Sequence, residues 1–222
     1  MSSSSPDTAA VDEEQLRAAD GRLPGRRGRQ TRDKLLDATA EMLDTRSYRD
    51  LSVVEIARSV GTSPATFYQY FGDVEAAILV LAQRMVEDGA ALHAAVAEAR
   101  WSGKSARDAA AELVDHFLAF WREHQAVLRV VDLAIAEGDQ RFRTIRNELL
   151  GPVTAALRDA AAELGRTEYD PAAAGAVLVS MLAHVAEHQS GLAQWGAGLP
   201  GVRDAMIGVV HWVLTGRKPP TE

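Results

Sequence analysis

The residues from Thr62 to Tyr70 combine hydroxyl, amide and aromatic side chains in a pattern that could contact DNA. Thr and Tyr hydroxyls can bond to phosphate oxygens, and the amide of Gln69 can make a paired contact to adenine. The methyl groups of Ala65 and Thr66 can touch the methyl group of thymine. These side chains could do so only if a helix presented them to the major groove.

The local sequence predicts such a helix and a second one before it. Ser63 is placed to be an N-cap and Pro64 occupies the first helical position, so a short helix starts here. Upstream, Ser52 and Glu55 form a capping-box pattern for a helix that runs to about Val60. Gly61 can supply the turn between the two helices. Two helices joined by such a turn form a helix-turn-helix, whose second helix enters the major groove.

The rest of the N-terminal region supports this motif. Apolar residues between Thr31 and Thr45 recur at helical spacing and predict a first helix there. Residues 1–24 are Ser-rich and acidic, which predicts a disordered tail. The packing partners expected for Phe67 and Phe71 are Leu36, Val54, Ala57 and Val60. Flexible cations just before the first helix could reach a DNA backbone or serve as a solvated linker: Arg22, Arg26, Arg27, Arg29 and Arg32.

Charge is distributed unevenly along the 222 residues, although the net charge is −7. The segment from Gly21 to Gly72 carries nine basic against six acidic residues, whereas the flanking parts are acidic. DNA binding needs clustered cations rather than a positive average, so the acidic total does not exclude it. The chain has no cysteine and no apolar run long enough to span a bilayer. We therefore expect a cytoplasmic protein without disulfides, thiolate metal sites or a membrane partner.

The remaining sequence predicts further helices and no strand. Asp73 caps a helix expected to reach Ala97, and Ser105 opens the next one. Separate helices are expected over Ala126–Glu137, over Asp139–Leu164 with a kink at Gly151-Pro152, and from Asp170 to about Gln189. A Gly-rich loop over Gly191–Gly198 precedes a last helix that begins at Pro200 and ends before Gly216. The fold class expected is all-α, with a helix-turn-helix domain over 25–72 and a larger helical domain over 73–222.

Three stretches, Leu51–Ala57, Val60–Ser63 and Thr66–Phe71, resemble the signature of the TetR family of bacterial transcription regulators. The resemblance covers roughly residues 31–85. It departs from the family at Val74, where a lysine is usual, and at Ser47, where a glycine is usual. The resemblance implies a long fourth helix joining the DNA-binding domain to a C-terminal ligand-binding and dimerisation domain.

The resemblance also implies functional residues and partners. In the family, the positions of Pro64, Ala65, Thr66 and Gln69 approach bases, and those of Ser52, Tyr68 and Tyr70 mostly position the backbone; core packing is the alternative for Tyr70. A homodimer would read an inverted-repeat operator in double-stranded DNA, most often as a repressor, and a small apolar or amphipathic effector would release it by tilting the fourth helix. The DNA-binding residues expected are Arg29, Thr31, Ser52, Thr62, Ser63, Pro64, Ala65, Thr66, Tyr68, Gln69 and Tyr70.

In the C-terminal region, large apolar side chains on the middle helices could line an effector pocket or fill a solid core. No cofactor is expected. The pocket candidates are Phe117, Phe120, Trp121, Leu128, Val131, Ile145, Leu149, Met181, His184, His188 and Trp195. The last two helices should pair with their copies in a second subunit, and the interface residues expected are Val177, Ser180, Val202, Met206, Val209, Val210 and Val213.

Two other classes of protein fit parts of the sequence. His184-Val185-Ala186-Glu187-His188 matches the H-x-x-E-H pattern of zinc enzymes, in which two histidines hold the metal and the glutamate is a base. A catalytic zinc needs a third protein ligand, and only Asp204 and Glu222 follow as acidic residues. A helical scaffold that binds only protein would explain a dimer but not the basic segment beside a capped helix. The expectation is therefore a regulator and not an enzyme.

Overall fold

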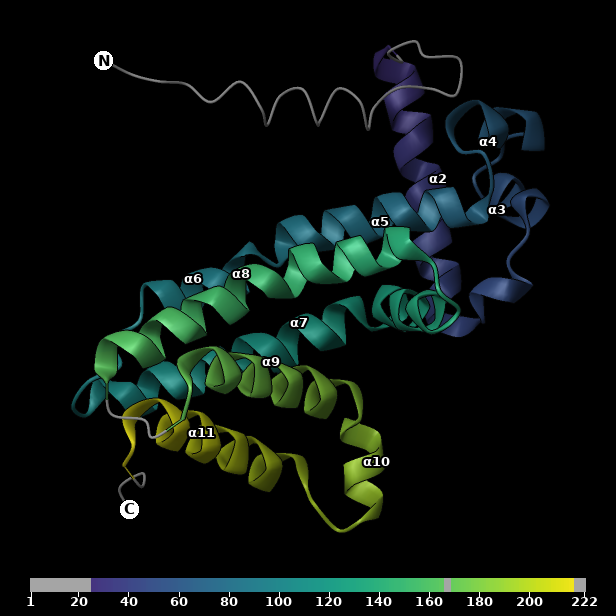
Figure 1. The fold of residues 1–222 in the computed structure, drawn as a ribbon. Helices are drawn as coiled ribbons and strands as arrows, with labels where there is room; N and C mark the ends of the chain where they lie inside the picture. Colours follow the sequence, from purple (N-terminus) through teal and green to yellow (C-terminus); the bar gives the residue numbers. More distant parts are fainter. Residues whose placement is uncertain (1–24, 166–168, 218–222) are drawn as a thin grey trace, which may run out of the picture. The chain divides into compact units, whose positions relative to one another are not determined.

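The computed structural model describes residues 25–165 and 169–217, and all regular secondary structure in these residues is helical. The expected all-α class is confirmed; the expected tail over 1–24 lies outside the described residues. Figure 1 shows the elements. In chain order they are α2 (Arg26–Thr45), the short 3-10 helix η1 (Tyr48–Asp50), α3 (Val53–Ser59), α4 (Pro64–Tyr70), α5 (Val74–Asp88), α6 (Ala90–Ala97), α7 (Ser105–Ala136), α8 (Gln140–Leu164), α9 (Pro171–Glu187), α10 (Gln189–Gln194) and α11 (Leu199–Thr215).

The chain packs into two compact units that do not follow the sequence in two simple blocks. Of the described residues, the first unit contains 25–84 together with Arg129–Phe142, and the second contains Met85–Leu128, 143–165 and 169–217. Helices α5, α7 and α8 therefore each contribute residues to both units. This division by packing does not coincide with the boundary at Gly72 that the sequence suggests.

The core of the first unit is formed by α2, α3, α4 and the start of α5. Phe67 and Phe71 are buried, with ring centroids 5.3 Å apart. Leu36, Ala57 and Val60 pack in the same cluster as expected, whereas Val54 is 50 % exposed and lies outside it. Val54 occupies the second position of α3, on the side opposite Ile56, which is fully buried.

The predicted start of the first helix is wrong by one and a half turns. The helix α2 begins at Arg26, where the carbonyl of Gly25 accepts the N–H of Arg29 at 3.0 Å. The arginines from Arg26 to Arg32 are therefore helical rather than flexible cations. Arg32 is 3 % exposed, and its guanidinium lies 5.3 Å from the centroid of the Phe71 ring. Arginine is a good helix former, so the basic segment extends the helix instead of preceding it.

In the second unit, the long helix expected after Asp73 is divided at Gly89. A Cβ atom on Gly89 would lie 2.4 Å from the Leu149 side chain on α8, so the glycine permits a close approach of the two helices. Its N–H contacts both the Met85 and the Val86 carbonyls, at 3.0 and 3.1 Å, and α6 starts at the next residue. The expected continuous helix from Asp73 to Ala97 is therefore α5 followed by α6.

Two other boundaries differ from the expectation, whereas α8 ends at Leu164 as expected. The helix α7 is continuous from Ser105 to Ala136, because no glycine or proline interrupts it, so a separate helix over 126–137 does not exist. The helix α8 continues through Pro152 to Leu164. The loop expected over 191–198 contains instead the end of α10, which follows α9 directly. Figure 1 shows α9 and α11 running side by side with α10 at their connection.

Candidate nucleic-acid interface

The start of α4 is fixed by its cap. The hydroxyl oxygen of Ser63 accepts the N–H of Thr66 at 3.2 Å and lies 3.0 Å from the Thr66 hydroxyl. Pro64 occupies the first helical turn, where its missing N–H costs nothing. Both features expected from the sequence are present, and they hold the first residues of the helix in one conformation.

The outer face of α4 carries the side chains that the sequence indicated. Tyr68 is 52 % exposed, and Ala65 and Gln69 are exposed as well. Phe67 is fully buried, so one face of this short helix anchors it while the opposite face stays open. Tyr70 belongs partly to the anchored side, because it packs against the core cluster with its ring 6.4 Å from that of Phe71. The structure thus favours the packing alternative for Tyr70.

The hydroxyl of Ser52 forms hydrogen bonds within its own helix. It accepts the N–H of Glu55 at 3.2 Å, the N-cap bond expected of a capping box, and donates to the Glu55 carboxylate at 2.9 Å. These bonds from Ser52, together with Arg46 at 3.2 Å, hold the pKa of the Glu55 carboxyl below its usual value. Ser52 therefore fixes the start of α3, which in turn supports α4.

The remaining candidates lie on α2 and in the turn before α4. Arg29 is exposed on the first turn of α2, and the Thr31 hydroxyl donates to the Arg27 carbonyl at 3.1 Å. Thr62 is half-buried in the turn, next to Gly61, which adopts the positive φ of 72° expected of a turn glycine. Contact of any of these residues with DNA stays a prediction.

The two departures from the family pattern have local explanations. Val74 is half-buried and packs against the core cluster, a place suited to an apolar side chain. Ser47 precedes η1 with a φ of −66°, which any residue can adopt, so no glycine is needed there.

Replacing Tyr68 by Phe should weaken operator binding about two- to tenfold at all sequences alike, because one hydroxyl contact to a phosphate contributes about 0.5–1.5 kcal/mol. A gel-shift titration with a fixed operator measures the change. Tyr169→Phe is the matched control, since Tyr169 is similarly exposed, at 58 %, but lies in the second unit. Unchanged affinity of Tyr68→Phe would show that this hydroxyl does not contact a phosphate.

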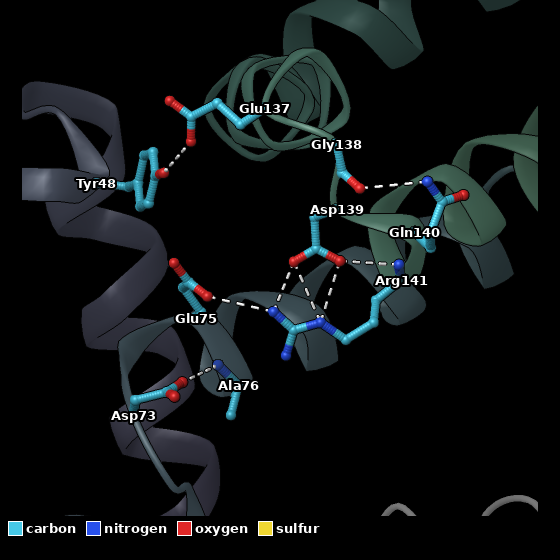
Figure 2. A network of polar contacts seen from close by, with 9 residues as sticks. All are labelled: Tyr48, Asp73, Glu75, Ala76, Glu137, Gly138, Asp139, Gln140 and Arg141. Carbon is cyan, nitrogen blue, oxygen red and sulfur yellow. Dashed lines mark hydrogen bonds and ion pairs between the residues drawn. The ribbon is translucent and has the colours of Figure 1, made fainter.

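Within the first unit, a network of charged side chains links η1 and the start of α5 to the turn between α7 and α8 (Figure 2). The Arg141 guanidinium contacts Asp139 at 2.6 Å and Glu75 at 3.2 Å. Glu137 forms an ion pair with Arg49 and accepts the Tyr48 hydroxyl at 3.4 Å. The bonds from Arg141 lower the pKa of the Asp139 carboxyl, and Asp139 in turn raises the pKa of Arg141.

Two further contacts extend this connection. The guanidinium of Arg129 on α7 donates to the Leu43 carbonyl near the end of α2 at 3.0 Å. Asp73 caps the start of α5, where Glu75 pairs with Arg141, by accepting the Ala76 N–H at 2.7 Å. The α7–α8 turn is therefore bonded to η1 and to the start of α5, the elements that flank the helix-turn-helix in the chain. This network could not be predicted from the sequence, because its partners lie far apart along the chain.

The apolar residues expected to line an effector pocket mostly form a packed interior. Phe117 and Trp121 are buried and stacked, with ring centroids 5.4 Å apart. The Trp121 indole N–H has no acceptor among the described residues. Phe120, Leu128, Ile145 and Leu149 are buried in the same unit, whereas the buried Val131 belongs to the first unit. Burial also lowers the pKa of His124, whose ring lies 4.5 Å from that of Phe120.

The other expected pocket residues lie at the surface or near it. Trp195 is 82 % exposed at the end of α10, and His184 and His188 are exposed on α9. Met181 is half-buried. Trp195 and the two histidines therefore face outward in a single chain, and their part in an effector pocket stays a prediction.

A surface groove of about 420 Å³ lies along α8 and the first turn of α9. Arg146 and Arg158 line it, Arg158 in an ion pair with Asp159 at 2.8 Å, and Gly151 has open space beside it. Arg146 also lies over the Trp121 ring, 5.7 Å from its centroid. The other lining residues are Asn147, Leu150, Thr154, Ala155 and Ala172. None of the pocket residues expected from the sequence lines this groove.

The helices α9 and α11 leave an apolar face exposed. Val177 is 64 % exposed, Val209 37 % and Trp212 50 %. Ser180 is exposed as well, and Val202 and Val213 are half-buried. Met206 and Val210 were expected at an interface but are buried in the protomer, at 3 % and 0 % exposure. The apolar stripe of α11 is broad enough to serve two faces, and these two residues lie on the inner one.

Two segments of the chain match models of known protein families. Residues 92–221 match the model of the tetracyclin repressor-like C-terminal domain, and residues 35–77 match that of the bacterial regulatory proteins of the tetR family. The chain belongs to the TetR family. Members of this family are DNA-binding transcription factors rather than enzymes. None of the curated proteins compared matches this TetR-family chain.

Solved structures share the fold at low identity. The fatty acid degradation regulator FadR from Bacillus halodurans is 17 % identical, covers 87 % of this chain and 97 % of its own, and has a TM-score of 0.63. FadR from Bacillus subtilis in complex with stearoyl-CoA is 15 % identical, with 83 % and 98 % covered and a TM-score of 0.61. A TetR-family regulator from Bordetella parapertussis is 17 % identical, with 81 % and 93 % covered and a TM-score of 0.53.

The structure also bears on the zinc-enzyme alternative and on membrane spans. In residues 25–165 and 169–217, no three His, Cys, Asp or Glu side chains form a group that could hold a metal ion. His184 and His188 stack on each other, and no third ligand for a catalytic zinc joins them. Among the helices described, none is long and apolar enough to cross a membrane.

Proposed function

We propose that this TetR-family regulator binds an inverted-repeat operator as a homodimer, acts as a repressor, and releases DNA when a small amphipathic effector with an anionic group binds. The observation that carries the proposal is the form of α4: a capped helix anchored by buried Phe67 and presenting Ala65, Tyr68 and Gln69 outward. Such a helix suits the major groove.

The dimer part of the proposal is supported by the exposed face of α9 and α11. Val177, Val209 and Trp212 are exposed apolar side chains on these two helices, and covering them in a dimer would remove apolar surface from water. A two-fold dimer through this face would bury the same residues on both copies and present two α4 helices to an operator with matching symmetry.

The effector part is supported by charge and shape. The groove along α8 carries Arg146 and Arg158, which suit a carboxylate or a phosphate. Arg146 also covers the buried Trp121, whose stacked aromatic surroundings suit an apolar chain if the interior opens. The structural neighbour from Bacillus subtilis binds stearoyl-CoA, a molecule that combines both chemical features.

The proposed response passes through the α7–α8 turn. Because α7 and α8 each belong to both units, an effector that shifts either helix in the second unit also displaces the Glu137–Arg141 segment of the first. The ion pairs of Arg141 and Glu137 would carry that shift to Glu75 in the first turn of α5, which follows α4, and to Arg49 in η1, which precedes α3. Binding of the effector then favours a conformation of the dimer that fits the operator poorly.

Selection of bound sequences from a random duplex library, at two salt concentrations, tests the proposal. We expect an inverted repeat to be enriched, with affinity falling about tenfold or more at the higher salt. Stearoyl-CoA and stearate, added to the complex, then test the effector class through release of DNA. Failure to enrich any sequence at low salt contradicts the regulator proposal, whereas an enriched repeat that neither molecule releases contradicts only the effector class.

A further inference from the structure

A pair of histidines at the end of α9 is not used by the proposed function. His184 and His188 are one helical turn apart, and their rings stack with centroids 4.2 Å apart and planes at 26°. Both side chains are exposed. Two imidazoles at this spacing on one helix face can bind the same metal ion, as they do in helical zinc sites.

The hydrogen bonding of His188 prepares it to be a ligand. Its Nδ1 lies 3.0 Å from the backbone carbonyl of His184. A carbonyl oxygen can only accept, so Nδ1 is the donor in this bond, and in the neutral imidazole Nε2 is then the nitrogen with the lone pair. A backbone carbonyl that fixes the tautomer in this way is the usual partner of a histidine that binds metal through its other nitrogen.

The position of the pair on α9 places it on the proposed dimer face. With about 100° between successive residues, Val177 and His184 lie within about 20° of each other around the helix axis, and His188 directly follows the helix with its ring stacked on that of His184. Val177 is the exposed apolar residue of this helix, at 64 %. A second copy that covers Val177 therefore approaches the two histidines as well.

One chain alone offers an incomplete site. The part of the chain that the structure describes brings no third His, Cys, Asp or Glu to the pair, whereas a closed zinc site takes four ligands. We propose that His184 and His188 of two copies hold one zinc ion at the dimer interface, as a structural site that strengthens association. The inference rests on the proposed dimer, and it differs from the catalytic zinc suggested by the H-x-x-E-H pattern because Glu187 has no role in it.

The test uses the full chain, stripped of metal with a chelator and titrated with zinc chloride. Calorimetry gives the stoichiometry and sedimentation equilibrium gives the dimer Kd with and without zinc. We expect one zinc ion for two chains, and a dimer about tenfold tighter when free zinc is well above its own Kd. His184→Gln and His188→Gln should each abolish both effects.

His116→Gln is the matched control. His116 is exposed on α7, and its Nδ1 likewise lies 2.7 Å from a backbone carbonyl, that of Glu112, but no second histidine lies one turn away. This variant should bind zinc as the unaltered chain does. Its loss of zinc binding would place the metal elsewhere and overturn the proposal.

Other outcomes separate the metal site from the dimer. If the dimer forms equally with and without zinc and binds no zinc, or one ion per chain, the proposal of a shared zinc site is overturned. The proposed dimer is then still supported. A chain that stays monomeric in both conditions overturns the proposed dimer, and the shared site falls with it.

Discussion

Replacing Phe67 by Ala should destabilise the first unit by about 3–5 kcal/mol and abolish operator binding. Phe67 is fully buried, and its ring contacts that of Phe71 in the cluster that joins α2, α3 and α4. A truncated side chain leaves a cavity at the junction of all three helices, which a short α4 cannot close without moving.

Chemical denaturation followed by circular dichroism measures the loss of stability, and a gel shift measures operator binding. Tyr68→Ala is the control for stability, since its side chain is 52 % exposed on the same helix and should cost much less. Equal losses for the two variants, or a loss below about 1 kcal/mol for Phe67→Ala, would show that the cluster does not hold α4.

The second large effect is expected from Gly175→Ala on α9. An added Cβ would lie 2.9 Å from the Thr154 carbonyl oxygen and 3.0 Å from the Arg158 nitrogen, both backbone atoms of α8. Backbone atoms cannot turn aside as a side chain can, so α8 and α9 must separate. We expect a cost of about 1–3 kcal/mol, which corresponds to a fall in Tm of roughly 2–4 °C per kcal/mol for a chain of this size.

Gly151→Ala provides a control that should change the stability in the opposite direction. Gly151 also lies inside a helix, but nothing stands within 4 Å of the position of its Cβ. Alanine there should stabilise α8 by up to about 1 kcal/mol through its higher helix propensity. If thermal unfolding showed the two variants to change Tm in the same direction, the close approach of α8 and α9 at Gly175 would be contradicted.

The parts of the fold predicted well from the sequence are those that local chemistry decides. Ser52, Glu55, Ser63 and Pro64 each act within four residues of their own position, and the structure has the caps that their spacing indicates. The positive φ of Gly61 follows from the same local logic. The helix-turn-helix could therefore be placed from sequence to within a residue or two.

The errors arise where packing between distant segments decides. Gly89 divides a helix at a point of contact with Leu149, sixty residues further along the chain, which no local pattern reveals. Met206 and Val210 share the apolar stripe of α11 with Val209, and only the neighbours of that helix determine which residues face inward. A stripe of apolar residues in the sequence shows that one side of a helix is buried. It does not show which of these residues face their own chain and which would face a second chain.

The candidate site shows the same contrast. The outward residues of α4 follow from its spacing, because burial of Phe67 leaves Ala65, Tyr68 and Gln69 on other sides of the helix. The charged network of Arg141 was not predictable, because a surface ion pair leaves no periodic pattern in the sequence. Its partner Glu75 stands 66 residues away.

The return of residues 129–142 to the first unit bears on how this protein can be divided or recombined. A fragment cut after Arg84 keeps every helix of the DNA-binding motif but loses the Glu137 carboxylate and the Arg141 guanidinium, leaving Arg49 and Glu75 without those partners. Fusing this DNA-binding domain to the C-terminal domain of a relative would likewise require that relative's α7–α8 turn to supply charged side chains that pair with Arg49 and Glu75. Exchange of DNA-binding domains within the family therefore depends on a segment that lies within the sequence of the C-terminal domain.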